Sequence, residues 1–567
     1  MKNARKINII VIFAAAIVLG LIGLFLIFNP MEKLQKKKDY GSALKASIDD
    51  DIYVDSLLSV YFREEQYYQD ILHYEIRLDL FPEYEEIKAK VIITGIKGKT
   101  TNDSIYLNFY DNLEISSLLV NGNKNNYTRT DYHLAIPNEN DTFRVEVDYY
   151  GSPQSLGFQS FQFGDYNESP VIYTLNQPVY ASTWFPCNDL PDDKAQADIF
   201  ITSDTSLTNV SNGVLIDEEY FGERKTTHWK TVYPISTYLI SFYSANYSNF
   251  KEQYTSIAGN TLLLDYYSFP NHLSEAMTDY SISSKALRVF EELFGEYPFI
   301  NEKYGIAEFL WNIGAMEHQT ITGMGTTFLT GRNFYIDIYI HELAHQWWGN
   351  AVGPKNWREL WLNEGFATYS QALYWEKTKG KNSYTNFLES HFGTFSGGTL
   401  YDPEQNLFGR RVYDKGAWVL HMLRCEVGDS LFFKILRNYY NSFRYKNAST
   451  EDFKRIAENI SNKNLGKFFD QWVIDGVGIL EVEYDLKYEF SDKIISRLEL
   501  RQAQEGYAVY HFPLEFKIIA GESSLISNHY ITSLDTTLYF ETDMKPSKII
   551  FDPNSKLLAL FREANLK

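Results

Sequence analysis

Cysteine is nearly absent from this chain of 567 residues, which contains only Cys187 and Cys425. Two thiols so far apart in the sequence argue against a disulfide framework, so packing has to hold the fold together. Internal repeats and long low-complexity tracts are also missing. Hydrophobic residues make up 44% of the sequence and aromatic residues 16%, which is typical of an ordered globular protein.

Positive charge is scarce as well. The 53 Lys and Arg residues are outnumbered by 73 Asp and Glu residues, and the net charge is −20 at pH 7. A chain this acidic should repel the phosphates of nucleic acid, so no nucleic-acid partner is expected. The same charge tolerates or attracts cationic ligands, including free α-amines.

One uncharged apolar run stands out, Ile9–Phe28, and its 20 residues are enough to cross a bilayer as a helix. Residues 1–28 are therefore predicted to form a basic head and an uncleaved single-pass membrane anchor, with a cleaved signal peptide as the alternative. A short basic head usually stays in the cytoplasm, so the rest of the chain is expected on the extracytoplasmic side. Residues 29–67 look like a stalk.

The remaining pattern predicts a multidomain α+β protein. Residues 68–250 contain stretches of strand-forming residues such as HYEIRLDLF and FRVEVDYY, broken by Asn, Gly and Asp, and indicate a large β domain. Helical apolar spacing prevails in residues 251–478, which are expected to form a largely helical domain. Strand patterns return in residues 479–567, enough for a small C-terminal β-sandwich.

The most informative motif is His341-Glu342-Leu343-Ala344-His345, followed by Glu364. Two histidines four residues apart lie on one face of a helix, so both imidazoles can reach one metal ion. A catalytic zinc has three protein ligands and an open position, and Glu364 is a natural third ligand. Glu342 is well placed to take a proton from water at that position. These residues predict a metallohydrolase with one zinc ion per chain.

Two further segments are weak signals when taken alone. Glu317 lies in the sequence GAMEH, 24 residues before His341, where a carboxylate could anchor a cationic substrate group. Tyr413 lies in VYDKGAWVLHML, which looks like the beginning of a helix near the site. A phenol there could donate a hydrogen bond to the oxyanion of a tetrahedral intermediate.

Together these segments resemble the zinc aminopeptidase family that includes alanyl aminopeptidase and leukotriene hydrolase. The resemblance rests on HELAHQWWGN, WLNEGFATY, GAMEH, VYDKG and WFPCNDLPDDKA, and it covers roughly residues 70–560. It implies a large saddle-like β domain, a thermolysin-like catalytic domain and a C-terminal β-sandwich. The chain looks like a short form that lacks the large C-terminal helical domain of many relatives.

The resemblance also assigns roles to matching positions. His341, His345 and Glu364 would bind zinc, Glu342 would be the general base, and Tyr413 would stabilise the oxyanion. The substrates would be peptides with a free N-terminus.

Substrate-binding positions follow from the same resemblance. Glu317 and Gln177 would grip the α-amine of the substrate, which fixes the cut one residue from the N-terminus. The segment Gly314, Ala315 and Met316 would pair with the substrate as an added strand.

The chain departs from the family pattern at several positions. His318 replaces the usual Asn after Glu317 and is expected to line the substrate site as a hydrogen-bond donor. Ser182 replaces a common Arg, and Gln177 stands where many relatives carry Glu. The spacing between Glu364 and Tyr413 is also short for the family.

The predicted function is removal of N-terminal amino acids from peptides by zinc-activated water. Three alternatives use the same residues: a leukotriene-type epoxide hydrolase, a zinc endopeptidase, and an inactive binding protein. The intact motif set argues against the last. The sequence leaves the preferred side chain and the oligomeric state open.

Overall fold

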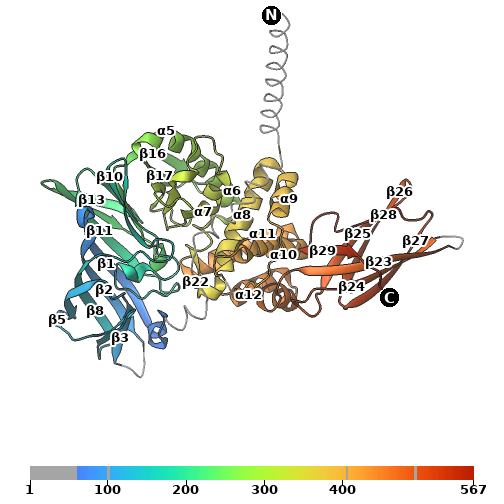
Figure 1. Cartoon of the computed structure of the whole chain (residues 1–567), viewed down its shortest axis with the longest axis horizontal. Coiled ribbons are helices and arrows are strands. Elements are labelled where there is room, and N and C mark those ends of the chain that lie inside the picture. The colour runs from blue at the N-terminus through green and yellow to red at the C-terminus, as the bar shows by residue number, and fades with distance from the viewer. Residues whose placement is uncertain (1–60, 99–102, 404–405, 491–493, 567) are drawn as a thin grey trace, which may run out of the picture. The chain divides into compact units, whose positions relative to one another are not determined.

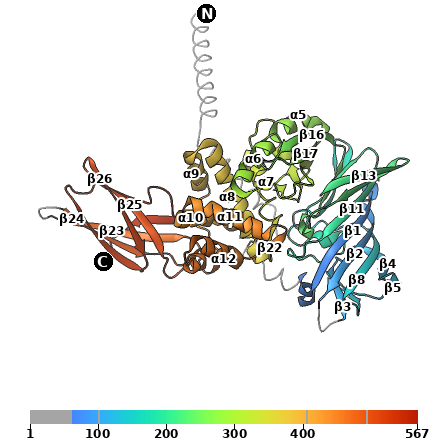
Figure 2. The ribbon, with the colours of Figure 1, turned by 180° about the vertical axis from the view of Figure 1, so that it is seen from behind.

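The computed structural model describes residues 61–98, 103–403, 406–490 and 494–566. Along the chain, an N-terminal β part is followed by a mixed α/β part and a C-terminal β part (Figure 1). The same order is visible from behind in Figure 2. The predicted anchor and most of the predicted stalk lie outside the described residues. Within the described ranges, no helix has both the length and the apolar character that crossing a membrane requires.

The N-terminal part is built on an eight-stranded sheet, in which β1 pairs in parallel with β11. Its strands form because apolar and polar residues alternate: Ile76 and Leu78 of β1 are buried, whereas Arg77 between them is exposed. In sheet order the strands are β13 (Val214–Phe221), β14 (Arg224–Lys230), β11 (Gln196–Asp204), β1 (Gln69–Phe81), β2 (Glu86–Lys97), β8 (Thr142–Gly151), β4 (Glu114–Val120) and β5 (Asn123–Lys124).

Two smaller sheets complete this part and confirm the predicted N-terminal β domain. One has the order β12 (Thr208–Ser211), β15 (Phe242–Ala245), β10 (Ser169–Thr174) and β9 (Phe161–Tyr166). The other joins β3 (Ser104–Asn108), β7 (His133–Pro137) and β6 (Thr128–Arg129). The segment after β10 leaves the sheet and carries Gln177 towards the mixed part.

A five-stranded sheet begins the mixed part. Its order is β16 (Ser248–Thr255), β17 (Thr261–Ser268), β18 (Lys303–Phe309), β20 (Ile321–Gly325) and β19 (Ala315–Met316), with β17, β18 and β20 parallel and β19 antiparallel at the edge. The predicted domain boundary between residues 250 and 251 falls inside β16, which pairs with β17.

Helices make up the rest of the mixed part, and the most buried of them is α8 (Trp361–Lys379), whose residues 361–374 are all buried. A helix that is buried on every side lies in the centre of the core. The other helices are α5 (Leu273–Asp279), α6 (Ile282–Phe294), α7 (Ile336–Ala344), α9 (Lys381–Ser390), α10 (Gly416–Val427), α11 (Asp429–Phe443), α12 (Thr450–Ser461) and α13 (Gly466–Phe469). Two short strands, β21 (Val352–Pro354) and β22 (Lys446–Ala448), pair in parallel beside them.

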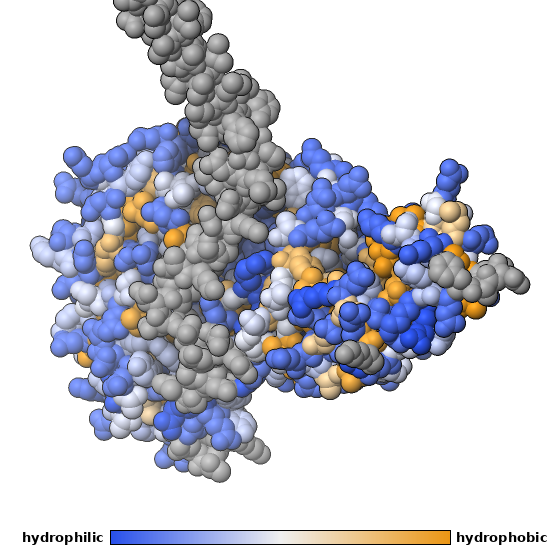
Figure 3. Space-filling view, turned by 45° about the vertical axis from the view of Figure 1, so that its right-hand side comes forward, coloured by the Kyte–Doolittle hydropathy of each residue, from blue (hydrophilic) through white to orange (hydrophobic). Residues whose placement is uncertain are grey.

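The C-terminal part consists of two sheets in contact. One has the order β27 (Asp535–Thr542), β24 (Ile494–Gln502), β23 (Leu480–Phe490) and β29 (Ala559–Glu563), and the other β26 (Ser523–Ile531), β25 (Phe512–Ala520) and β28 (Lys548–Phe551). Phe551 stacks on Phe561 of the opposite sheet with ring centroids 4.6 Å apart. Hydrophilic side chains cover most of the face shown in Figure 3, and hydrophobic ones are scattered between them.

Candidate metal centre and active site

The two histidines of the motif lie at the end of α7. His341 belongs to its last turn, and His345 continues the helical hydrogen bonding because its N–H donates to the carbonyl oxygen of His341. Residues at this spacing share one helix face. Their Nε2 atoms consequently lie 3.0 Å apart.

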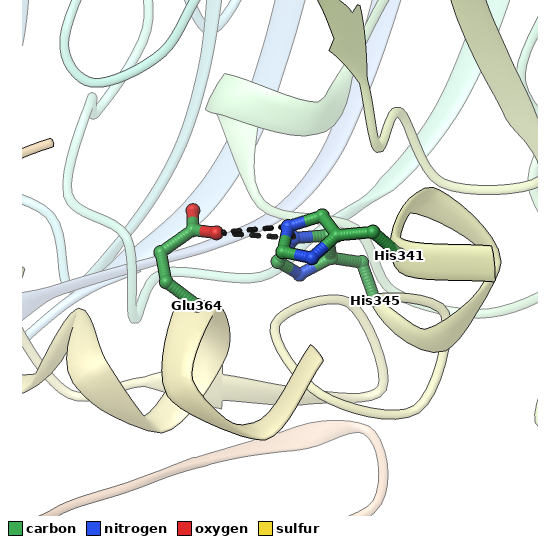
Figure 4. A group of neighbouring side chains, drawn as sticks. All are labelled: His341, His345 and Glu364. Atoms are coloured by element: carbon green, nitrogen blue, oxygen red, sulfur yellow. Dashed lines mark hydrogen bonds and ion pairs between the residues drawn. The ribbon is translucent and has the colours of Figure 1, made fainter. Parts of the chain in front are cut away.

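The third predicted ligand comes from the first turn of α8. One carboxylate oxygen of Glu364 lies 3.3 Å from the Nε2 atoms of both His341 and His345. Figure 4 shows the carboxylate pointing from its helix at the two rings. Both Glu364 and His345 are buried, and the side chain of His341 is 13% exposed, so the group is open on one side only.

Hydrogen bonds on the far side of each ring set the imidazole tautomers. His345 Nδ1 lies 3.0 Å from the carbonyl oxygen of Trp348, which can only accept. His341 Nδ1 lies 3.1 Å from Oε1 of Gln371, whose amide nitrogen donates to the carbonyl oxygen of Asp337. Both Nδ1 atoms are therefore protonated, and both Nε2 lone pairs point at the same place.

This donor set fits zinc. Two Nε2 atoms 3.0 Å apart, with a carboxylate oxygen 3.3 Å from each, converge on one place that a cation can fill. Tetrahedral zinc with bonds of about 2.0–2.1 Å holds its ligand atoms roughly 3.3 Å apart. Glu364 and the two histidines are thus suited to hold one zinc ion.

Two more carboxylates face the same place. Ligand atoms of Glu317, Glu342 and His345 lie within 4.8 Å of one another. Burial and the other carboxylates raise the pKa of Glu342 well above its usual range, and burial raises that of Glu317 to about 7. Among the described residues, Oε2 of Glu342 has no hydrogen-bond partner. The site therefore favours ligands that carry positive charge or that can donate a proton to a carboxylate.

Glu317 is held by a residue from the N-terminal β part. The side-chain amide of Gln177 donates to a carboxylate oxygen of Glu317 at 3.1 Å, across 140 residues of sequence. Both side chains are buried. The two residues expected to grip an amine are thus brought together, and the carboxylate keeps further acceptor positions.

The segment before Glu317 is an edge strand. Ala315 and Met316 form β19, which pairs with β20 on one side and ends the five-stranded sheet on the other. Gly314 precedes it, and a Cβ there would lie 2.8 Å from the ring of Trp311, so the chain passes too close to the indole for any side chain. An edge strand offers unpaired backbone groups to an extended peptide.

Tyr413 reaches the site from a single π-helical turn, Arg411–Lys415, that leads into α10. Its ring stacks beside that of His341 with centroids 5.9 Å apart. Burial, together with Glu364 and the other carboxylates, raises the Tyr413 pKa well above its usual value, so the phenol keeps its proton. This approach is possible because Gly365 has no side chain: a Cβ there would lie only 2.9 Å from the Cα of Gly416. Two glycines thus let α8 and α10 touch.

His318, which was predicted to line the substrate site as a hydrogen-bond donor, directly follows Glu317 in the sequence. It is completely buried, and its Nδ1 lies 2.6 Å from the hydroxyl of Tyr243. Burial lowers its pKa to about 3, so the ring is neutral. Nε2 of His318 has no hydrogen-bond partner among the described residues, and the ring is not one of the converging metal-ligand groups.

Several residues around the site were not singled out from the sequence. Gln371 and Tyr243 contact His341 and His318, and no spacing rule marks either of them. Gln346 and Asn350 lie inside HELAHQWWGN and hold the backbone of residues 317 and 318. Their position within the motif is the one signal that could have drawn attention to them.

Two family patterns match the chain in the regions that form this site. The pattern of the peptidase M1 N-terminal domain matches residues 71–239. The pattern of the peptidase family M1 domain matches residues 278–472. Gln177 lies in the first region, and the predicted zinc ligands, Glu317 and Tyr413 lie in the second.

Known aminopeptidases are similar to this chain in sequence and in fold. The chain is 25% identical over 518 residues to "Probable aminopeptidase 2" of Sulfurisphaera tokodaii, which covers 86% of this chain and 62% of that protein. Aminopeptidase A of Legionella pneumophila, solved with aspartic acid, has a similar fold, with a TM-score of 0.78, 18% identity, and coverage of 90% of this chain and 61% of that one.

A second solved structure is an M1 zinc metallopeptidase of Deinococcus radiodurans bound to a Tyr-Ser-Ala substrate. Its TM-score is 0.64 at 23% identity, and the match covers 71% of this chain and 94% of that one.

This chain thus spans about three fifths of the length of the Sulfurisphaera and Legionella proteins. The matched regions nevertheless include the whole candidate site. From the two matching family patterns, the related sequences and the shared fold, the chain belongs to the peptidase M1 family.

Proposed function

We propose that the protein is a zinc-dependent aminopeptidase that removes single amino acids from the N-termini of peptides. The observation that carries the proposal is the contact between Gln177 and Glu317 beside the zinc ligand His345. A buried carboxylate at this place needs a cationic partner, and the α-amine of a peptide supplies one. Peptidase M1 membership supports the same reaction class.

The metal ligands in this proposal are His341, His345 and Glu364. Bound zinc would polarise the scissile carbonyl and lower the pKa of water towards neutrality. Proton transfer, oxyanion stabilisation and substrate binding are the tasks of the protein's own side chains.

Glu342 moves the proton in this mechanism. Its Oε2, which has no hydrogen-bond partner among the described residues, accepts a proton from the attacking water, because a raised pKa makes the carboxylate a stronger base. The same carboxyl then passes the proton to the leaving amine. Tyr413, which stays protonated, donates a hydrogen bond to the oxyanion of the tetrahedral intermediate.

Exopeptidase action follows from how the substrate is held. Glu317 and Gln177 bind the α-amine, while the edge strand β19 pairs with the substrate backbone. The amine and the reacting carbonyl belong to the same residue, so this geometry selects the first peptide bond. An acetylated N-terminus would leave the Glu317 carboxylate buried without its partner and should be rejected.

The test compares aminoacyl-coumarin amides with their N-acetylated twins, using the full-length purified protein. Each pair is assayed directly, after removal of metal with a chelator, and after zinc is added back. Cleavage of the free-amine compounds alone, lost with chelator and restored by zinc, is the expected result. Cleavage of acetylated compounds would indicate an endopeptidase, and no cleavage by zinc-loaded protein would reject the proposal.

We also propose a membrane location. The apolar run Ile9–Phe28 behind a short basic head supports a single-pass anchor, with the catalytic part on the extracytoplasmic side. Extraction of cell membranes with alkaline carbonate tests the anchor, and protease accessibility in intact cells tests the side. We further infer that the two C-terminal sheets form a β-sandwich, which the stacking of Phe551 on Phe561 supports.

A further inference from the structure

A buried lysine of the N-terminal β part reaches the loop that follows the zinc helix. Lys194 belongs to the segment WFPCNDLPDDKA, and its Nζ donates to the carbonyl oxygens of Asn350 at 2.6 Å and of Ala351 at 3.3 Å. The contact joins residues 156 positions apart in the sequence. The proposed mechanism does not use this lysine.

Asn350 continues the connection to the amine-binding residue. Its side-chain amide donates to the carbonyl oxygen of Glu317 at 2.6 Å, and its backbone N–H donates to the carbonyl oxygen of the zinc ligand His345 at 3.0 Å. Asn350 is completely buried. One residue therefore fixes Glu317 relative to the metal helix.

The connection forms a closed ring around Glu317. Gln177 holds the Glu317 side chain, Asn350 holds the Glu317 backbone, and Lys194 holds Asn350. Gln177 and Lys194 come from the same short segment of the N-terminal β part, between β10 and β11. This segment therefore holds Glu317 directly through Gln177 and indirectly, by way of Asn350, through Lys194.

Among the residues that the structure describes, hydrogen bonds to carbonyl oxygens and not a counter-ion hold the amino group of Lys194. Among the described residues, no carboxylate lies within ion-pair distance of its Nζ, and burial lowers its pKa to about 7. A Cβ on Gly353 would lie 3.0 Å from Cε and 3.1 Å from Nζ of Lys194. The glycine therefore makes room for the ammonium group at the two carbonyls.

We infer that Lys194 is a positioning residue for recognition of the substrate amine, acting through Asn350 on Glu317. The inference rests on the proposed aminopeptidase function. Its physical basis is that an amine-binding carboxylate must be held within a fraction of an ångström of its working position. A donor that fixes the backbone of Glu317 from outside the catalytic part supplies this constraint.

The experiment uses full-length protein with Lys194→Met, which keeps the length of the side chain and removes its donors. We expect KM for free-amine aminoacyl amides to rise about tenfold, since hydrogen bonds to charged groups contribute on this scale, with kcat and zinc content little changed. Lys97→Met is the matched control. Lys97 is also buried and donates to one carbonyl oxygen, of Asn138 at 2.6 Å, but it lies in the eight-stranded sheet. Its KM should stay at the wild-type value.

A double-mutant cycle separates positioning from a general effect on the fold. In a Glu317→Gln background, Lys194→Met should raise KM by less than about twofold, because the carboxylate that it positions is gone. An equal rise in both backgrounds would overturn the inference. So would an unchanged KM in Lys194→Met itself.

A second variant covers the case in which Lys194→Met does not fold. Asn350→Ala breaks the same ring at its next contact and should give the same rise in KM. A wild-type KM in that variant would overturn the inference. Failure of the wild-type, zinc-loaded protein to cleave any free-amine compound would instead reject the proposed function, which keeps the two outcomes distinct.

Discussion

Two clusters of histidines and carboxylates in this molecule look alike in composition and differ in charge balance. The candidate active site combines His341 and His345 with the carboxylates of Glu317, Glu342 and Glu364. On the eight-stranded sheet, Asp198 alone accepts from three basic side chains, His73 at 2.8 Å, His228 at 2.6 Å and Lys230 at 2.9 Å.

The difference indicates which cluster is suited to a metal ion. In the candidate active site, acidic groups outnumber basic ones, and all are buried except His341, whose side chain is 13% exposed. The Nε2 atoms of the two histidines lie 3.0 Å apart. Around Asp198 the basic groups outnumber the acid and the side chains of His73 and Lys230 are 31% and 47% exposed, so the cluster neutralises itself. Within the described ranges, three or more metal-ligand atoms converge only in the active site.

The largest effect should come from removing a zinc ligand. His345→Ala should lose bound zinc and more than about a hundredfold in aminopeptidase activity, since changes to partners of metal ligands alone cost about 10–100-fold. Metal analysis of the purified protein and aminoacyl-amide hydrolysis check this. His228→Ala, the matched change in the other cluster, should keep both; zinc loss in that variant would break the comparison.

Next comes the proposed base. Glu342→Gln should keep zinc and lose about 10²–10⁴-fold in kcat, because the amide cannot accept the proton of water. Asp198→Asn, the same carboxylate-to-amide change in the self-neutralised cluster, should keep kcat. If Glu342→Gln retained more than about a tenth of the activity, another group would have to be the base.

A smaller loss is expected for the oxyanion donor. Tyr413→Phe should lower kcat by about 10²–10³-fold, the usual effect of one such donor, with little change in KM. Tyr149→Phe serves as the control, because its buried hydroxyl donates to the carbonyl oxygen of Trp184 within the N-terminal β part. Equal kcat losses in the two variants would point to a loss of folding rather than of catalysis.

The smallest effect should be on stability, in the Asp198 cluster. Asp198→Asn should lower the free energy of unfolding by about 1 kcal/mol, because partly exposed ion pairs are screened by solvent. Chemical denaturation checks this.

The pH dependence of that effect has a defined sign. Partial burial raises the Asp198 pKa, but the hydrogen bonds from Lys230, His228 and His73 outweigh it and lower the pKa below its usual value. The stabilisation is therefore present above the unfolded-state pKa of about 4 and is lost as pH falls through the lower folded-state pKa. A difference between wild type and Asp198→Asn that grew on acidification would contradict this assignment.

The outline of the fold was predictable because the spacing of apolar and polar residues along the chain indicates strands and helices. Alternating residues predicted the N-terminal β domain, and the order of β, mixed and β parts follows the chain. The five-stranded sheet inside the helical part was harder to see, since β18 is buried at every residue and shows no alternation. The edge strand β19 has only two residues and leaves no pattern.

The sequence by itself predicted the candidate metal centre, because helix geometry places His341 and His345 on one face and Glu364 lies in the first turn of the next long helix. Tertiary structure alone decided what surrounds it. Gln177 reaches Glu317 across 140 residues, and Lys194 reaches Asn350 across 156 residues. Tyr413 reaches the centre because α8 and α10 touch. Local spacing is set by backbone geometry, whereas contacts over such separations depend on how whole sheets and helices pack.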